Sequence, residues 1–83
     1  MVMIPTIHMN GDKKETLLEG YCTAIHAVRA AAEAVQQNAH PNGRNFYPQG
    51  PDAIHRAIEE HIKRMVAIRG VLVELETMAE GIA

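Results

Sequence analysis

The sequence predicts a mainly α protein with a short N-terminal β-strand, in which two long antiparallel helices form an oligomeric helical bundle. Two apolar stripes at helical spacing are separated by a single polar segment, residues 38–50, so the helices should fold back on each other as a hairpin. With 83 residues, the chain is one domain, residues 1–83, of a size that buries little surface by itself.

Residues 2–9 are predicted to form the strand. They mix β-branched and long apolar residues with Pro5, which suits an edge strand because proline lacks one ladder donor. Asn10 and Gly11 should then turn the chain. The segment is short and has no basic leader, so we expect neither a signal peptide nor a membrane-spanning helix.

The first helix is predicted over residues 13–37. Asp12 and Glu15 have the spacing of a capping box, which would start the helix near Lys13. The only cysteine, Cys22, rules out an internal disulfide, fits a reducing compartment and is interpreted as a small buried side chain. The apolar stripe of this helix comprises Leu18, Tyr21, Ile25, Val28, Ala32 and Val35.

The second helix is predicted over residues 51–81. Pro51 suits the first helical position, and Asp52 favours the positive end of the helix. Its main stripe has heptad spacing and comprises Ile54, Ile58, His61, Met65, Ile68, Leu72, Leu75, Ala79 and Ile82. A second stripe beside it comprises Ile62, Val66 and Val73.

Each helix is apolar over a wider face than one neighbour can cover. A monomeric hairpin would therefore expose a large apolar patch, and we expect at least a dimer, built as a four-helix bundle from two hairpins. The net charge of −2 and the pI near 6.2 argue against partners such as nucleic acid polymers or an anionic membrane, although a local basic cluster could still hold a small anion.

The segment between the helices holds two of the three aromatic residues. Aromatic faces, a forked cation and amide donors lie within a few residues of each other there, which suits a small, flat, anionic ligand such as a nucleotide. The alternative is that the two rings plug the open end of the hairpin while the arginine is solvated. The candidate ligand-binding residues are Arg44, Asn45, Phe46, Tyr47 and Gln49.

No catalytic residues, cofactor or metal site are predicted. The chain has no serine, and Cys22 with His26 at helical spacing is more typical of packing than of a nucleophile. His55 and His61 are six residues apart and point to different sides of a helix, which leaves only a metal site assembled between subunits open. Acidic residues of the second helix, Glu76 among them, are interpreted as a solvated face.

His61 breaks the pattern because it falls on the apolar stripe of the second helix, with Arg64 one turn on. It is either a core histidine satisfied by one partner or, with Arg64, part of a polar pocket near the loop. Both residues lie about three turns into the helix. A ligand at Phe46 and Tyr47 would reach them only if the pocket is deep or another subunit completes it.

These segments together resemble a known family. Ile7-His-Met-Asn-Gly11, then a helix with Tyr21, then Arg44-Asn-Phe-Tyr-Pro-Gln-Gly50, and finally a helix with His61 and Arg64, is similar to the phage anti-Thoeris signal sponges of the first described type. The resemblance implies a short N-terminal sheet, two long helices, dimers that assemble into hexamers, and no catalysis.

The resemblance also implies a function. Such a sponge sequesters cyclic ADP-ribose-type signals made by bacterial TIR-domain enzymes, and some members hold cyclic oligonucleotides at a separate site. The protein would act in the cytoplasm of the infected bacterial host. His8 and Asn10 would contribute to the binding site from the same or a neighbouring subunit. Two alternatives remain: a small phage helical hairpin that inhibits a host protein, and an enzyme acting on nucleotides.

Overall fold

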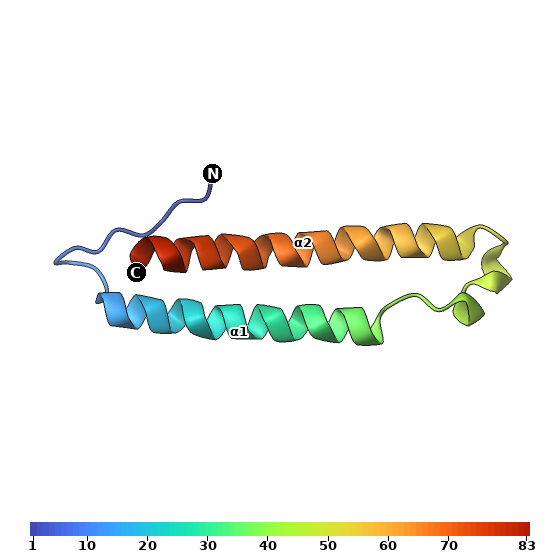
Figure 1. Cartoon of the computed structure of the whole chain (residues 1–83), viewed down its shortest axis with the longest axis horizontal. Helices are drawn as coiled ribbons and strands as arrows, with labels where there is room; N and C mark the ends of the chain where they lie inside the picture. The colour runs from blue at the N-terminus through green and yellow to red at the C-terminus, as the bar shows by residue number, and fades with distance from the viewer.

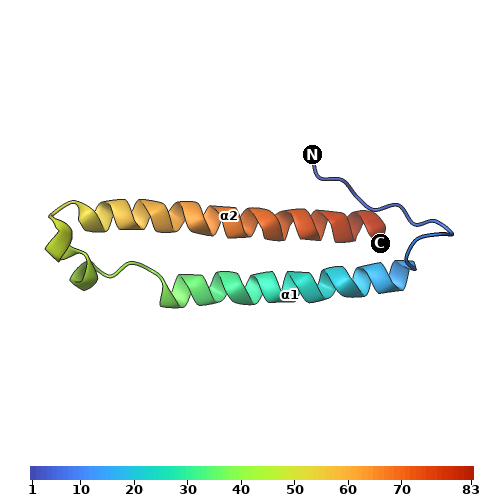
Figure 2. The same cartoon turned by 180° about the vertical axis from the view of Figure 1, so that it is seen from behind.

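The computed structural model describes all 83 residues as a helical hairpin (Figure 1). Helix α1 spans Lys14–Asn38 and helix α2 spans Ala53–Ile82, with two short 3₁₀ helices, η1 (Gly43–Asn45) and η2 (Tyr47–Gln49), between them. The molecule measures 60 × 23 × 16 Å. Both termini lie at one end of the rod and the connection lies at the other (Figures 1 and 2).

Helix α1 begins one residue later than predicted, and the predicted capping box is wrong. Lys13, not Asp12, occupies the N-cap position, and no side chain bonds to the first turn. Glu15 is consequently the second helical residue instead of the third. Its carboxylate can interact favourably with the positive end of the helix dipole, but it is not at the position from which it would accept the N-cap backbone N–H in a capping box.

Helix α2 begins at Ala53, two residues after the predicted start. Pro51 lies in the turn before the helix, and Asp52 holds the N-cap position without a side-chain bond. The chain enters this turn through Gly50, whose φ of 119° is a conformation that residues with a Cβ rarely adopt. The glycine therefore sets the direction in which α2 leaves the connection.

The predicted strand at residues 2–9 is wrong. Residues 1–8 have no regular secondary structure, and the turn that follows is closed by the Gly11 N–H donating to the His8 carbonyl at 3.2 Å. The segment runs beside the end of α2 (Figures 1 and 2), where the Ile4 side chain packs over Gly81. A strand needs a second strand to pair its N–H and C=O groups, and this chain has no other extended segment.

The core is thin and lies on one side of α2. The buried residues are all on that helix, and none is on α1. They are Ala53, Ala57, His61, Met65 and Ile82. The total accessible surface is 6384 Å², whereas a compact monomer of this mass exposes about 4,900 Å². Roughly 1,500 Å² more surface is therefore exposed than a globular chain of this size would leave.

The second stripe of α2 is part of that surface. Ile62, Val66 and Val73 are 56%, 65% and 59% exposed, and their spacing of four and seven residues places them on one face. Neither helix is long and apolar enough to cross a lipid bilayer.

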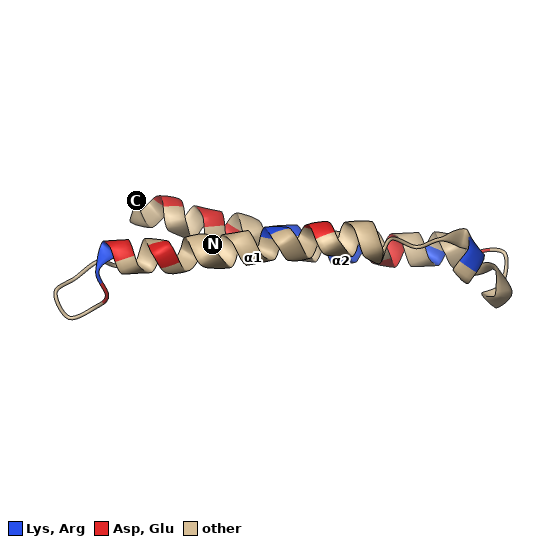
Figure 3. Ribbon diagram, turned by 90° about the horizontal axis from the view of Figure 1, so that it is seen from below, with Lys and Arg blue, Asp and Glu red and all other residues tan.

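Besides the Gln36–His61 bond described below, two polar contacts join α1 to the C-terminal part of the chain. The Arg29 guanidinium meets the Glu76 carboxylate at 2.7 Å, and Lys14 Nζ donates to the Ala83 carbonyl at 3.1 Å. After Arg69, the charged residues of α2 are all acidic, which the dipole disfavours near a helix C-terminus (Figure 3). The two cations of α1 offset that charge, each by about 1 kcal/mol or less because the pairs are exposed.

The register of the hairpin is offset toward the loop. Gln36, near the end of α1, bonds to His61, which lies in the third turn of α2. The first two turns of α2, about 10 Å, therefore extend beyond the end of α1 (Figure 1). Residues 39–52 continue past the end of α1 beside this overhang and then turn into α2 (Figure 1), and Ala53 and Ala57 are small enough to let the loop approach closely.

Two glycines of α2 test the docking of the N-terminal segment. Gly70→Ala should stabilise the protein by about 0.5–1 kcal/mol, because a Cβ there meets nothing within 4 Å and alanine is the better helix former. A Cβ at Gly81 would come within 2.8 Å of Ile4 Cγ2, so Gly81→Ala should gain less and should expose residues 1–8 to protease. Urea unfolding and limited proteolysis measure both effects; equal gains at the two positions would show that Ile4 is not docked.

Candidate ligand pocket at the loop end

A pocket of about 300 Å³ lies where the connection crosses the overhanging turns of α2. The end of α1 and the loop form one wall, and α2 forms the other. Most of the lining groups are polar: amides, one imidazole, one guanidinium and one carboxylate. The lining residues are Asn38, Ala39, His40, Pro41, Asn42, Asn45, Phe46, Ala57, Glu60 and Arg64.

Three of the candidate residues predicted from the sequence meet in this pocket: Asn45, Phe46 and Arg64. The loop runs beside the overhang, so one chain brings Phe46 to the same pocket as Arg64 without a second subunit. Gln49 lines an adjoining pocket of about 210 Å³, which shares Phe46, Ala57 and Glu60 with the first.

Arg44 and Tyr47 do not line either pocket. The Asn42 carboxamide oxygen caps η1 by accepting the Arg44 N–H at 3.0 Å, and the same oxygen lies 3.4 Å from Arg44 Nε. The Tyr47 side chain is 75% exposed. Phe46, which is half-buried, therefore closes the hairpin end, while Tyr47 leaves its ring in solvent.

His8 and Asn10 lie at the opposite end of the rod, in the segment between Ile4, which packs over Gly81, and Lys14, which bonds to Ala83. Within one chain they are separated from the loop by most of the 60 Å length of the molecule. They could reach a ligand at this pocket only from another copy of the chain.

His61 lies next to the pocket, in contact with His40, which lines it. It is only 3% exposed, its Nε2 lies 2.8 Å from Gln36 Oε1, and its ring packs edge-on against His40 with 4.8 Å between the centroids. Because Gln36 Oε1 accepts, Nε2 carries the proton, and the buried Nδ1 is left as an acceptor without a donor. His61 is thus a core histidine with one partner, placed directly beside the pocket.

The surroundings of His61 favour its neutral form. Burial lowers the pKa of His61 from its ordinary value of 6.5, and the neighbouring His40 and Arg64 lower it further. Arg64 has no carboxylate within ion-pair distance, since the only salt bridge of the chain joins Arg29 to Glu76. The Arg64 guanidinium is therefore not held in an ion pair, although the Glu60 carboxylate lines the same pocket.

Sequence reasoning did not identify Gln36, His40, Asn42 or Glu60. Each becomes part of the site through the register and the path of the loop, and neither follows from helical periodicity. One feature of the sequence could have indicated Gln36. A polar residue on an apolar stripe, such as His61, requires a polar partner on the facing helix.

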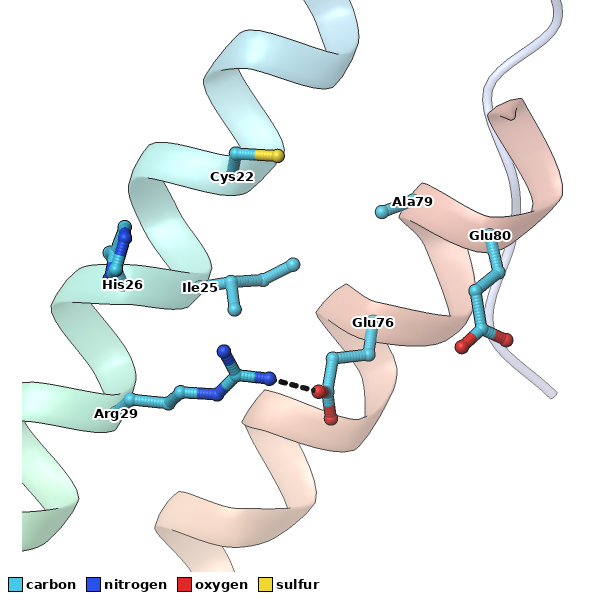
Figure 4. A pocket seen from close by; sticks show the side chains of 7 residues that line it. All are labelled: Cys22, Ile25, His26, Arg29, Glu76, Ala79 and Glu80. Carbon is cyan, nitrogen blue, oxygen red and sulfur yellow. Dashed lines mark hydrogen bonds and ion pairs between the residues drawn. The ribbon is translucent and has the colours of Figure 1, made fainter.

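A second cleft, of about 300 Å³, lies between the first half of α1 and the last turns of α2 (Figure 4). Arg29 extends from α1 across to Glu76 there, so Glu76 is a half-buried ion-pair partner and not the solvated residue that the sequence predicted. The prediction that Cys22 is buried is also wrong, because it is exposed at this cleft. It makes no hydrogen bond with His26, and no cluster of three metal-ligating side chains occurs in the chain.

Comparisons with known protein families, with curated proteins and with solved structures found no match to this chain. The resemblance to the anti-Thoeris sponges therefore depends on the sequence segments named above, and any function comes from the chemistry of the site.

His61 should make the folded state sensitive to mild acid. Its folded pKa lies below 6.5, so the unfolded chain binds more protons as the pH falls through and below 6.5. The free energy of unfolding should be highest above that pH and should decrease until the folded pKa is passed. Urea unfolding between pH 7.5 and 5 measures this, and His61→Asn should flatten the profile whereas His55→Asn, at an exposed position, should not.

Proposed function

We propose that the protein is a phage anti-defence sponge that binds a cyclic ADP-ribose-type immune signal and holds it without cleaving it. The observation that carries the proposal is the loop-end pocket, in which the Phe46 ring, the Asn45 amide and the Arg64 guanidinium line one space. An adenine stacks on an aromatic face, and a pyrophosphate accepts from a guanidinium and amides. The resemblance of the sequence to the sponge family supports the same ligand class.

The chemistry of the lining agrees with binding. It offers donors from Asn38, Asn42, Asn45 and Arg64, but no hydroxyl or thiol that could act as a nucleophile. A sponge has to hold its ligand against a competing receptor, which requires a slow off-rate and no turnover.

The volume of the pocket supports assembly of the chain. About 300 Å³ is at the lower end of the range for small-molecule sites, so a signal with two riboses, an adenine and two phosphates needs a further wall. A second copy would supply it, and the exposed ring of Tyr47 lies in the same loop. We therefore include a homo-oligomer in the proposal, either a dimer or a hexamer assembled from dimers.

The surface of α2 supports this assembly. The chain exposes roughly 1,500 Å² more than a compact monomer of its mass, whereas a standard interface takes about 800 Å² from each partner. Ile62, Val66 and Val73 form the largest exposed aliphatic row on either helix, and a second hairpin would cover it.

The same row favours one alternative function. A small helical hairpin with an exposed aliphatic face could instead dock on a host protein and inhibit it. In that case the loop-end pocket would be a by-product of packing, and nucleotide signals would not bind.

Binding is tested with purified protein and cyclic ADP-ribose isomers. The protein should retain one signal through gel filtration and release it intact on heating. Phe46→Ala should weaken binding by about tenfold or more, since a base–aromatic stack contributes about 1–3 kcal/mol. Arg64→Gln should weaken it by a similar factor through loss of a charge-assisted contact.

The matched control is Lys63→Gln, which removes the same charge one residue away at an exposed position outside the pocket. Calorimetric titration of the three variants should separate position from net charge. Recovery of a hydrolysed product would move the assignment to an enzyme, and equal binding by Arg64→Gln and wild type would remove the pocket from the site.

Assembly is tested by sedimentation at micromolar concentration. The wild type should sediment above its 9.1 kDa monomer mass, and Val66→Glu should reduce the mass by placing a charge in the aliphatic row. Ala67→Glu is the control, because this exposed position lies about 100° around the helix from Val66. A folded, stable wild-type monomer would contradict the oligomer.

A further inference from the structure

The loop-end pocket is lined by one guanidinium, Arg64, and one carboxylate, Glu60. Arg64 makes no ion pair, His40 lines the same pocket, and His61 packs against His40 with 4.8 Å between the ring centroids. Three basic side chains thus lie close together on one side of the pocket. A dianion beside them would be attracted by each one that is charged.

The groups around His61 can be stated for every element that faces it. The neutral Gln36 comes from α1, His40 from the connection just after it, and Arg64 and, on the wall of the pocket, Glu60 from α2. The charges of Glu60 and Arg64 are equal and opposite, so the pocket gains net positive charge only when an imidazole beside it takes up a proton.

The buried Nδ1 of His61 is the place where a proton can be added. Nε2 already carries one and donates it to Gln36 Oε1, whereas Nδ1 is an acceptor without a partner. Two positive neighbours oppose the second proton while the pocket holds no anion. A doubly charged anion in the pocket would reverse this balance, because its field is poorly screened in a partly dry site.

We propose that the pocket is a subsite for a phosphate-type dianion and that it binds the anion together with a proton taken up by the His40–His61 pair. Arg64 and the Asn amides hold the anion, and the histidine pair supplies the additional positive charge only when the anion is present. The proton is assigned to the pair because the two rings are in contact, so a charge on either ring acts on the other. For its natural ligand the inference rests on the proposed function, where the pyrophosphate of the signal would occupy this subsite.

Proton uptake with the anion makes both the affinity and the stability of the protein depend on pH. A ligand that binds with uptake of about one proton gains up to about tenfold in affinity for each unit by which the pH falls. The ligand-free protein loses stability over the same range. Acid should therefore weaken the fold of the empty protein and strengthen its affinity for the anion, and the bound anion should restore the stability.

The experiment uses sulfate, a dianion that does not itself titrate near neutral pH, and follows the histidine rings by NMR at constant ionic strength with chloride as the balance. The titration midpoint of His61 should move upward as sulfate is added. The ring of His55, which is exposed outside the pocket, should titrate identically in sulfate and chloride and serves as a control within the same molecule.

Two variants sharpen the test. Arg64→Gln should abolish the effect of sulfate on His61. Gln36→Glu places a carboxylate against His61 Nε2, so the pair should already be protonated without an anion and sulfate should add little. Identical His61 titration in sulfate and chloride would overturn the proposal, as would a sulfate effect that survives Arg64→Gln.

The result also separates this inference from the function. If the protein retains a cyclic ADP-ribose-type signal while sulfate leaves His61 unchanged, the sponge stands and the proton-linked subsite is wrong. If sulfate raises the His61 midpoint while no signal is retained, the anion subsite stands and the sponge assignment fails.

Discussion

The offset between the two helices is the constraint on which the rest of this structure depends. Gln36 pairs with His61 across the hairpin, so α2 extends about two turns beyond α1 and the connection has to run beside these turns to reach the start of α2. A connection that simply reversed direction would have left Phe46 at the tip, far from Arg64. The offset instead makes a covered space, and the small side chains of Ala53 and Ala57 let the loop form its wall.

The core is thin because the chain has only two helices. Each helix can bury only the part of its apolar face that meets the other, and α1 buries no residue fully. The aliphatic row on α2 is left over by this geometry. In the proposed assembly the same surplus would both stabilise the chain and bring a second surface to the pocket, so stability and binding would depend on one another.

The sequence predicted the helices well, because periodicity reports which residues share a face, and the apolar stripe of each helix is its less exposed side. It failed where structure depends on partners or on register. Residues 2–9 have the composition of a strand but no strand to pair with, and the Asp12–Glu15 box is displaced by one residue because Lys13 takes the cap position. The sequence predicted part of the pocket lining, namely Asn45, Phe46 and Arg64. It did not predict His40 and Glu60, because their positions in the pocket are set by how far the helices are offset.

His61 shows why that offset matters for function as well as for shape. An aliphatic residue at this position would pack in the apolar stripe without a buried, unpartnered Nδ1, which costs about 1–3 kcal/mol when left unsatisfied. The cost would be smaller if a solvated histidine were placed one turn nearer the end of the helix. The register fixes this imidazole between Gln36, which holds its proton, and His40, which lines the pocket. A residue that weakens the core is therefore also the one that connects the core to the pocket, through its contact with His40.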